Sequence, residues 1–509
     1  MPDEPRRNVA VIASEAVPFA KTGGLADVAG ALPRALEHLG HSATIFLPYY
    51  RIARGSALPT TATGLRLRIP VGTKMVDGTV HTTILPGSNV HVYLIDGEDY
   101  FDRPQLYGED GADYTDNCER FVFFDRAVLE TIRILGLRFD VLHCNDWQTG
   151  LIPVYLEEHY RRRPEFAAVG TLLTVHNLAY QGSFWHWDMP LTGLDWRLFN
   201  WRQVEFHGRL NFLKAGLVFA DLVSTVSPTY AREIQTPALG CGLDGLLRSR
   251  RQDLHGIVNG IDLSVWSPSV EPMLAARYDD STVKEGKAAC KAQLQRLAGL
   301  PERPDVPILA QIGRLDPQKG WDLLAGVADD LLRGDVQMVV LGEGHARYHT
   351  LLKRLADTHP GKLRAFLEFS SMLAHQIEAG ADIFLMPSLY EPCGLNQLYS
   401  LVHGTVPVVR ATGGLADTVV DATPMSVADG TATGFTFHEP TPVALRAAID
   451  RALALWPQGN LWKAIMQEGM RGDWSWDHSA REYVRLYQEI GRRSEARRGD
   501  RRSTRGISI

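Results

Sequence analysis

The chain has 509 residues, of which 45% are hydrophobic and 22% are charged, and its formal net charge is −6. This length exceeds what one hydrophobic core supports, so we expect two or more domains. The mildly negative charge argues against a general nucleic-acid-binding surface. The sequence contains no run of 18 apolar residues, so we expect no membrane partner. The five cysteines form no C-x-x-C pair, which argues against a disulfide framework or zinc site and favours a cytoplasmic protein.

Short apolar runs alternate with amphipathic stretches through the first half of the chain. A helix is predicted over residues 27–40, after a buried strand that covers "NVAVIAS". The predicted strands of this half are residues 8–14, 43–48, 90–96, 139–146, 170–176 and 221–227. The alternation of strand and helix indicates βα units and a mostly parallel sheet.

The same rhythm restarts after a turn-rich stretch, with predicted strands at residues 307–313, 336–344, 381–388 and 405–411. We therefore predict an α/β fold with two doubly wound, Rossmann-like domains that face an interdomain cleft. The predicted parts are a first domain over 1–258, a linker over 259–268, a second domain over 269–473, a helix over 474–490 that packs back on the first domain, and a basic disordered tail over 491–509.

The six residues TGGLAD occur twice, as Thr22–Asp27 and as Thr412–Asp417. A Gly-Gly pair between a strand and a helix permits unusual backbone angles and lets a ligand approach the amides at the positive end of the helix. Lys21 adds a cation before the first copy. The repeat predicts a phosphate-binding turn in each domain, and the alternative is a tight turn that binds nothing.

Three further side chains of the second domain favour a phosphorylated sugar as ligand. Arg314 and Lys319 flank a predicted strand-to-helix loop, where both could reach one diphosphate, or could simply be solvated. Glu391 follows another predicted strand and could accept hydrogen bonds from sugar hydroxyls, beside the helix-start amides of Gly394 and Leu395.

Nine motifs, taken in order along the chain, resemble those of the bacterial glycogen synthases of glycosyltransferase family 5, which have the GT-B fold. The motifs are "KTGGLADV", "HCNDWQTGL", "TVHNLAYQG", "NFLKAGL", "VSPTYAREI", "NGID", "GRLDPQKG", "EPCGLNQL" and "RATGGLADTV". The resemblance runs from about residue 8 to residue 488 and leaves out only the tail. It implies a retaining glucosyltransferase that moves glucose from ADP-glucose to the non-reducing end of an α-1,4-glucan. No metal-ligand cluster is visible in the sequence, so we expect activity without a metal or cofactor.

The resemblance also implies roles for individual residues. The catalytic set is His176, Glu391, Lys319 and Arg314. The donor-binding set is Lys21, Gly23, Gly24, Asn259, Arg314, Lys319, Phe369, Glu391, Gly394, Leu395, Thr412, Gly413 and Gly414. The acceptor-binding set is Glu15, Asp27, Asp146, Trp147 and Asn177. Phe369 departs from the tyrosine frequent at the adenine-stacking position, which keeps a stacking ring but loses a hydroxyl contact.

Simpler interpretations stay open for several of these residues. Asp146 could cap a helix near Thr149, and His176 could be an ordinary interior histidine. The tryptophans of residues 184–201 could stack on sugars, pack inside or lie on a mobile loop. Two other functions also stay open, a nucleotide-sugar epimerase of the same architecture and a non-catalytic glucan-binding protein.

Overall fold

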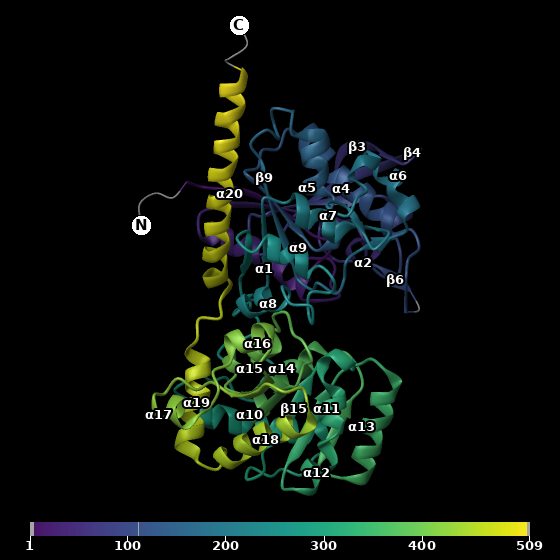
Figure 1. Ribbon diagram of the computed structural model, residues 1–509. Helices are drawn as coiled ribbons and strands as arrows, with labels where there is room; N and C mark the ends of the chain where they lie inside the picture. Colours follow the sequence, from purple (N-terminus) through teal and green to yellow (C-terminus); the bar gives the residue numbers. More distant parts are fainter. Residues whose placement is uncertain (1–4, 110, 506–509) are drawn as a thin grey trace. The chain divides into compact units, whose positions relative to one another are not determined.

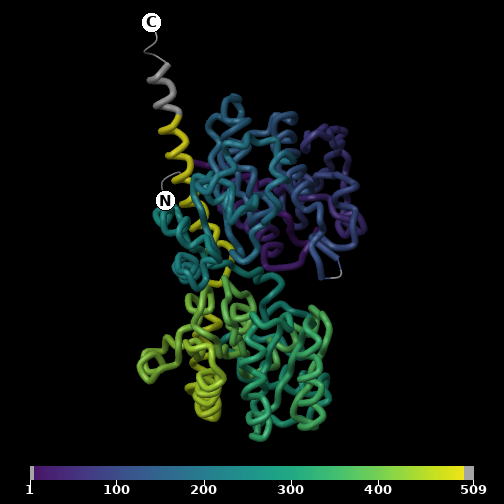
Figure 2. Tube along the Cα trace, turned by 45° about the vertical axis from the view of Figure 1, so that its right-hand side comes forward, coloured from purple at the N-terminus to yellow at the C-terminus, as the bar shows by residue number. Residues whose placement is uncertain are grey.

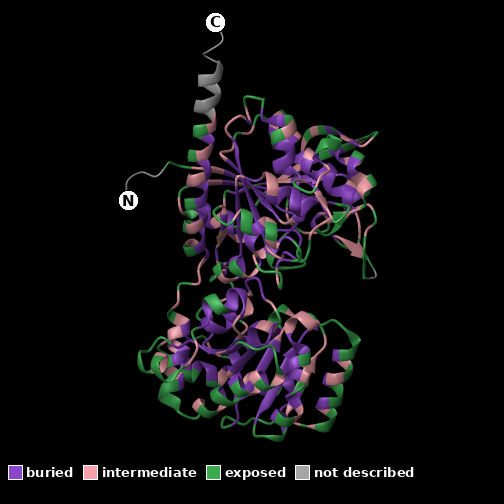
Figure 3. Cartoon of the chain, viewed as in Figure 1, coloured by how far each residue is buried: buried purple, intermediate pink, exposed green. Residues whose placement is uncertain are grey.

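The computed structural model of the chain describes residues 5–109 and 111–505, which form two compact units (Figure 1). The first unit consists of Met1–Val226, Ala231–Gly260 and Trp476–Ile509, and the second consists of Ser227–Tyr230 and Ile261–Ser475. In each unit the central strands are buried and the outer faces of the helices are exposed (Figure 3). No helix of the described ranges combines the length and apolarity that a bilayer crossing requires.

Nine strands of the described first unit form one sheet, in the order β14-β13-β9-β8-β1-β2-β5-β4-β3. Their bounds are β1 (Asn8–Ile12), β2 (Ser42–Pro48), β3 (Thr61–Val71), β4 (Lys74–Ile84), β5 (His91–Asp96), β8 (Val141–Asn145), β9 (Gly170–Val175), β13 (Leu222–Thr225) and β14 (Leu254–Gly256). Neighbours from β14 to β5 pair in parallel, with Val9 of β1 opposite Val141 of β8. The central strands read as continuous apolar runs because helices cover both faces of a parallel sheet.

The strands β3 and β4 form an antiparallel hairpin at one edge, which the sequence analysis did not predict. Along β3 the exposed and less exposed positions alternate, as expected where one face of a strand meets water. Short antiparallel pairs lie outside the main sheet, namely β6 (Gly108–Glu109) with β7 (Ala112–Asp113), and β12 (Arg209–Asn211) with β10 (Ser183–Phe184) and β11 (Glu205–Phe206).

The α-helices of the first unit include two long amphipathic ones, α1 and α4. The bounds of all the described α-helices are α1 (Gly24–His38), α2 (Arg51–Arg54), α3 (Glu98–Phe101), α4 (Asn117–Ile134), α5 (Ile152–Tyr155), α6 (Met189–Thr192), α7 (Phe212–Phe219), α8 (Pro228–Glu233), α9 (Asp244–Ser249) and α20 (Trp476–Arg505). A boundary between the two units falls inside α8, between Tyr230 and Ala231. One core cluster contains Val9 and Val11 of β1, Leu32 of α1 and Tyr487 of α20.

Helix α20, near the end of the chain, lies against the first unit in both views (Figures 1 and 2). Five of its buried residues recur at alternating intervals of four and three, namely Trp476, Ala480, Tyr483, Tyr487 and Ile490. That spacing places them on one helical stripe, which joins the core of the first unit.

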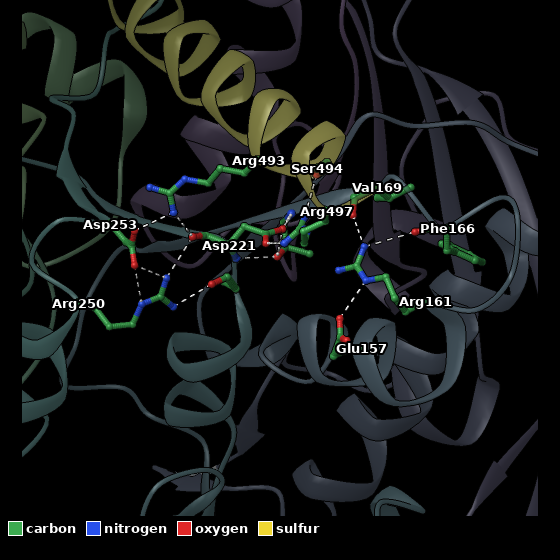
Figure 4. A network of polar contacts seen from close by, with 12 residues as sticks. Glu157, Arg161, Phe166, Val169, Asp221, Arg250, Asp253, Arg493, Ser494 and Arg497 are labelled. Carbon is green, nitrogen blue, oxygen red and sulfur yellow. Dashed lines mark hydrogen bonds and ion pairs between the residues drawn. The ribbon is translucent and has the colours of Figure 1, made fainter. Parts of the chain in front are cut away.

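The structure corrects the expectation that the chain is disordered from residue 491, because α20 continues as helix to Arg505. Arg493 donates to a carboxylate oxygen of Asp253 at 2.8 Å, and Arg497 pairs with Asp221 (Figure 4). The arginines were expected to be solvated, but these two meet carboxylates of the first unit. The part of the predicted tail at 506–509 lies outside the described residues.

Six parallel strands of the described second unit form its sheet, in the order β17-β16-β15-β18-β19-β20. Their bounds are β15 (Ile308–Ile312), β16 (Gln337–Leu341), β17 (Leu363–Phe366), β18 (Ile383–Met386), β19 (Val406–Arg410) and β20 (Phe435–Phe437). The helices are α10 (Val283–Ala298), α11 (Trp321–Ala325), α12 (Ala328–Arg333), α13 (Ala346–Thr358), α14 (Ser371–Gly380), α15 (Asn396–Val402), α16 (Gly413–Thr418), α17 (Pro424–Ala428), α18 (Pro442–Leu455) and α19 (Gly459–Arg471).

Both sheets have a point where the strand order reverses. In the first unit β1 lies between β2 and β8, and in the second β15 lies between β16 and β18. Ligands of doubly wound folds bind outside the carboxyl ends of the strands at such points. The expected architecture of two doubly wound parallel sheets is confirmed, and it directs attention to the loops that follow β1, β8 and β9 in one unit and β15, β18 and β19 in the other.

Candidate active site

Glu15 organises the first TGGLAD turn, which follows β1. Its buried carboxylate accepts hydrogen bonds from the Thr22 hydroxyl at 2.6 Å, from the backbone N–H of Thr22, and from the backbone N–H of Gly23 at 3.1 Å. The Tyr107 hydroxyl donates to the same carboxylate at 2.7 Å. The backbone amides of Thr22 and Gly23, which were expected to face a phosphate, thus already bind a carboxylate of this chain.

Lys21 and the two glycines of that turn are exposed, and Asp27 is half-buried. The Lys21 ammonium pairs with Asp27 at 2.7 Å, and nearly half of its side chain is accessible. Burial raises the pKa of Asp27, and the charge of Lys21 opposes that rise. A Cβ built on Gly23 meets nothing within 4 Å, and its φ of −150° suits any residue. The steric reason for glycine at position 23 therefore does not come from a contact within the protein.

Asp146, directly after β8, has a strained backbone. Its φ is 56°, in a region that non-glycine residues rarely adopt. Its carboxylate accepts the backbone N–H of His176 at 2.7 Å and that of Asn177, and it caps no helix. Burial raises the pKa of Asp146 to about 7. The aspartate thus joins the ends of two neighbouring strands, β8 and β9, which the capping interpretation did not foresee.

His176, which follows β9, is neutral and has a defined tautomer. Burial lowers the pKa of this histidine to about 3. Its Nε2 lies 2.9 Å from Oδ1 of Asn145, whose own amide donates to two backbone carbonyls. Since that oxygen accepts, Nε2 carries the proton, and Nδ1 presents a lone pair.

The other predicted residues of the first unit lie in mixed surroundings. Trp147 is largely buried, with its ring 4.9 Å from Phe121. Asn177 is half-buried, and its side-chain oxygen accepts the backbone N–H of Ala179 at 3.0 Å. Asn259 is buried in the first unit, two residues before the chain enters the second unit at Ile261. Trp147 therefore packs against aromatic neighbours, and only 9% of its surface is accessible.

In the second unit, Lys319 and Glu391 form an ion pair at 2.6 Å. Glu391 is buried in the loop after β18 and also accepts a hydrogen bond from Ser388 at 3.0 Å. Lys319 ends the turn that follows β15 and is half-buried. The ammonium donates one of its three hydrogens to Glu391, so two stay available for another acceptor.

Arg314 and Phe369 are the exposed members of the predicted donor set. The guanidinium of Arg314 forms no ion pair within the described ranges, and only its backbone carbonyl is engaged, by the indole N–H of Trp321 at 3.0 Å. Phe369 is 86% exposed, ahead of α14. An uncompensated guanidinium and a bare aromatic face suit the two ends of a nucleoside diphosphate.

The second TGGLAD turn supports the loop that carries Glu391. A Cβ on Gly413 would lie 1.9 Å from the carbonyl oxygen of Glu391, and one on Gly414 would lie 2.1 Å from that of Cys393. The φ of Gly413 is 45°, and that of Gly394 is 74°. The glycines of this copy are therefore required by close backbone packing inside the second unit, whatever they bind.

The rest of this turn is engaged within the second unit too. Thr412 is fully buried, and Leu395 is half-buried just before α15. Asp417, the last residue of the second copy, accepts hydrogen bonds from the Ser227 hydroxyl at 2.5 Å and from the Thr229 N–H at 2.9 Å. The two copies of TGGLAD thus hold different partners, since the aspartate of the first copy pairs with Lys21.

Three positioning residues were not predicted. Tyr107 and Ser388 donate to Glu15 and Glu391, and Asn145 accepts from His176. Asn145 and Ser388 could have been found, because each lies at the carboxyl end of a predicted strand, Asn145 next to Asp146 and Ser388 three residues before Glu391. Tyr107 lies 92 residues from Glu15 and outside every predicted element, so no local signal marks it.

Two families match the chain. Residues 8–249 match the family described as starch synthase catalytic domain, and residues 297–467 match the one described as glycosyl transferases group 1. These two ranges fall mainly in the first and the second unit, respectively.

Solved structures with the same architecture include a plant enzyme. The catalytic domain of starch synthase IV from Arabidopsis thaliana, bound to ADP and acarbose, is 30% identical, with a TM-score of 0.88 over 96% of this chain and 100% of that chain. Sucrose-phosphate synthase from Thermosynechococcus elongatus, at 18% identity and a TM-score of 0.60 over 95% and 99% of the two chains, shares the fold alone.

Curated bacterial relatives are similar over nearly their whole length. A glycogen synthase of Anaeromyxobacter sp. (strain Fw109-5) is 49% identical over 480 residues, which are 94% of this chain and 98% of the relative. A glycogen synthase of Rhodopirellula baltica is 45% identical over 492 residues, covering 94% and 97%. The resemblance carried by the sequence motifs is thereby confirmed, and the chain belongs to the glycogen synthase family.

Proposed function

We propose that this chain is a retaining glucosyltransferase that moves glucose from ADP-glucose to the non-reducing end of an α-1,4-glucan. Its membership of the glycogen synthase family supports this activity. The observation that carries the site is the ion pair of Lys319 with buried Glu391, at the carboxyl edge of the second sheet where the strand order reverses. The exposed Arg314 lies in the same loop after β15 as Lys319.

The donor's diphosphate would be bound by Arg314 and Lys319. Breaking the bond between glucose and phosphate leaves negative charge on the diphosphate, and two cations oppose that charge as it develops. Arg314 brings an uncompensated guanidinium and Lys319 brings two remaining hydrogens. The exposed ring of Phe369 would stack on adenine, and the Arabidopsis relative that contains ADP is consistent with that ligand.

Glu391 would accept hydrogen bonds from the glucose hydroxyls. Its carboxylate already accepts from the ammonium of Lys319 and the hydroxyl of Ser388, and such a carboxylate is a weak nucleophile. The diphosphate leaves with little need of protonation, so a glycosidase pair of carboxylic acids is not required. We therefore favour departure and attack on one face of the sugar, with the leaving phosphate taking the acceptor's proton.

The first unit would bind the glucan and the sugar end of the donor. Glu15, Asp27, Asp146, Trp147 and Asn177 are assigned to the acceptor, and Lys21, Gly23, Gly24 and Asn259 to the donor. The open space at Gly23 supports close approach of a ligand there. Neutral His176, with a lone pair on Nδ1, can accept a hydrogen bond from a sugar hydroxyl but cannot supply a positive charge.

The remaining donor assignments concern the loops around Glu391. Gly394, Leu395, Thr412, Gly413 and Gly414 are proposed to shape the diphosphate side of the site. Because Gly413 and Gly414 pack on the backbone of residues 391–393, they act through the position of Glu391. A cytoplasmic location is part of the proposal, since the cysteine pattern suits a reducing compartment.

Transfer of labelled glucose onto glycogen tests the proposal. The wild-type protein should incorporate label from ADP-glucose, and Lys319→Ala and Glu391→Ala should each lose at least about a hundredfold in kcat, a typical loss for a group that stabilises transition-state charge. Lys353→Ala, which removes an exposed lysine from α13, is the matched control and should retain full activity.

Two outcomes would contradict the assignment. Near wild-type rates in Lys319→Ala or Glu391→Ala would remove that residue from the site. Epimerised sugar nucleotide formed without any glucan primer would replace the transferase with an epimerase. A covalent glucosyl adduct trapped on any side chain would overturn the single-face mechanism while leaving the overall activity in place.

A further inference from the structure

A group of tryptophans lies on the surface of the first unit, between β9 and α7. Trp185 is 57% exposed, Trp187 is 58% exposed and Trp196 is 45% exposed. Their rings touch in series, with centroids 6.4 Å apart for Trp185 and Trp187 and 5.9 Å apart for Trp187 and Trp196. The series ends on Phe199, 5.4 Å from Trp196. We call Trp185, Trp187 and Trp196 the tryptophan platform.

These side chains are not core residues. Each tryptophan leaves close to half of its surface or more in water, although burial of that area would stabilise the fold at about 25 cal/mol per Å² of apolar surface. A contiguous aromatic patch on a protein surface marks an interaction site more often than an isolated apolar side chain does. The structure thus excludes the interpretation that these three tryptophans pack inside the protein.

Local structure holds the platform in place. The short helical turn His186–Asp188 leads into α6, and a second turn covers Trp196–Leu198. Met189 and Leu198 are fully buried beneath these turns, and Asp195 accepts the backbone N–H of Arg197 at 2.8 Å. Rings with few rotatable bonds on an anchored backbone lose little conformational entropy when they bind a ligand.

The platform follows, along the chain, a residue that packs against Trp147 of the proposed acceptor side. Phe184, next to Trp185 in the chain, packs on Trp147 at 5.7 Å and on Phe212 at 4.8 Å. Gly182 has a φ of 59°, and a Cβ there would lie 2.3 Å from the Trp147 ring. The chain therefore passes directly from Phe184, which packs on Trp147, to Trp185 as the first residue of the platform.

We infer that Trp185, Trp187 and Trp196 form an additional α-glucan-binding surface, which holds a stretch of the acceptor chain outside the residues that act on its end. The inference rests on the proposed glucosyltransferase function, which supplies a polymer as acceptor. A glucose unit has an apolar C–H face that stacks on an aromatic ring and a rim of hydroxyls that stays in water. Successive ring spacings of 5.4–6.4 Å are comparable with the width of a hexose.

Electrophoresis through gels that contain glycogen measures binding without catalysis. Trp185→Ala, Trp187→Ala and Trp196→Ala should migrate faster than wild type in glycogen gels and equally in gels without it, with apparent glycogen affinity lowered about tenfold in the double variant Trp185→Ala/Trp187→Ala. Trp187→Phe keeps a stacking ring and should retain most of the affinity. Unchanged circular dichroism and melting temperature establish that the variants are folded.

Kinetics on two primers separate this surface from the reaction site. The double variant should raise the KM for glycogen about tenfold, while the kcat, the KM for ADP-glucose and the KM for a short maltooligosaccharide stay within about twofold. Trp201→Ala is the matched control, since Trp201 is 70% exposed and its ring stacks under Arg202 instead of joining the platform. It should behave as wild type in both assays.

Failure of the two proposals would look different. A wild-type protein that transfers glucose to neither primer contradicts the proposed function, whereas gel retardation still reports on the platform. Wild-type glycogen affinity in the double variant, or an equal loss in Trp201→Ala, overturns the platform. So does a change in sedimentation without a change in glycogen affinity, because the tryptophans would then join two copies of the chain.

Discussion

Asp146 shows how a single residue can connect two strands at the edge of a sheet. Its φ of 56° belongs to a region that costs non-glycine residues about 1–3 kcal/mol. Its N–H donates to the carbonyl of Thr174 at 2.9 Å, and its carboxylate receives the N–H of His176 at 2.7 Å. These two hydrogen bonds connect Asp146 with Thr174, inside the end of β9, and with His176, the first residue after β9. They therefore set the position of His176.

The raised pKa of Asp146 predicts a pH-dependent difference between wild type and Asp146→Asn. The folded-state pKa is about 7, against an ordinary value of 3.8. A group with a raised folded-state pKa loses its stabilising contribution as pH rises between those two values. The wild-type free energy of unfolding should therefore fall relative to Asp146→Asn by up to roughly 1.4 kcal/mol per pH unit from about pH 4 to 7, and not change further above.

Urea unfolding of both proteins at several pH values measures this difference. Asp140→Asn provides a control carboxylate, since Asp140 lies just before β8 and accepts the backbone N–H of Asn8 at 2.8 Å. A constant difference between wild type and Asp146→Asn across the range would show that the carboxylate is ionised throughout.

At the scale of elements, the two TGGLAD turns have the same residues and different surroundings. In the turn before α1, Glu15 binds the backbone, and Gly23 has no neighbour that a methyl group would meet. In the turn that begins α16, Gly413 approaches the carbonyl of Glu391 so closely that no side chain fits. Gly23 of the first copy thus leaves room beside it, and the glycine pair of the second copy supports another loop.

Alanine substitutions should separate these two roles. Gly413→Ala combines a φ of 45° with a Cβ 1.9 Å from a backbone oxygen, so it should lower the melting temperature by several degrees. Gly23→Ala meets nothing within 4 Å at a φ that any residue adopts, so it should melt within about a degree of wild type. Differential scanning calorimetry makes the comparison.

The same pair also tests ligand approach to the first turn. If the space at Gly23 receives the donor, Gly23→Ala should raise the KM for ADP-glucose while leaving the melting temperature unchanged. A Gly413→Ala protein as stable as wild type would contradict the close backbone packing that the structure places there.

At the scale of the whole molecule, two separate sheets each present their functional loops at a reversal of strand order. The cations assigned to the diphosphate, Arg314 and Lys319, both lie in the second unit, although the chain carries a net charge of −6. Nucleotide recognition is therefore expected to be local to that unit and to be independent of the overall charge.

ADP should accordingly raise the melting temperature of wild type and not that of Lys319→Ala. A ligand at a hundred times its Kd stabilises the folded state by about 2.7 kcal/mol, which thermal unfolding detects readily. Lys353→Ala is the control and should respond to ADP as wild type does. Equal stabilisation of all three proteins would place the nucleotide away from Lys319.

The sequence was most informative about elements whose signal is local. The apolar runs predicted every central strand of both sheets to within a few residues, as with 8–14 against Asn8–Ile12 and 381–388 against Ile383–Met386. This signal did not identify the hairpin β3-β4, because its exposed and buried positions alternate and few of its apolar residues are consecutive in the sequence. It also failed for the tail, because arginines that pair with Asp221 and Asp253 resemble solvated ones.

Residue types and motif order, by themselves, determined the family, the two parallel sheets and the choice of Lys319, Glu391 and Arg314, because those features are local and repeat at regular spacing. Only the tertiary structure decided that Lys319 pairs with Glu391, that Glu15 binds the first glycine turn, and that three tryptophans stay in water. The Lys319–Glu391 pair joins residues 72 apart in the chain, and the other two features depend on how a loop folds back on itself and on what covers it. Their existence depends on how strands and loops pack together, which periodicity and composition do not encode.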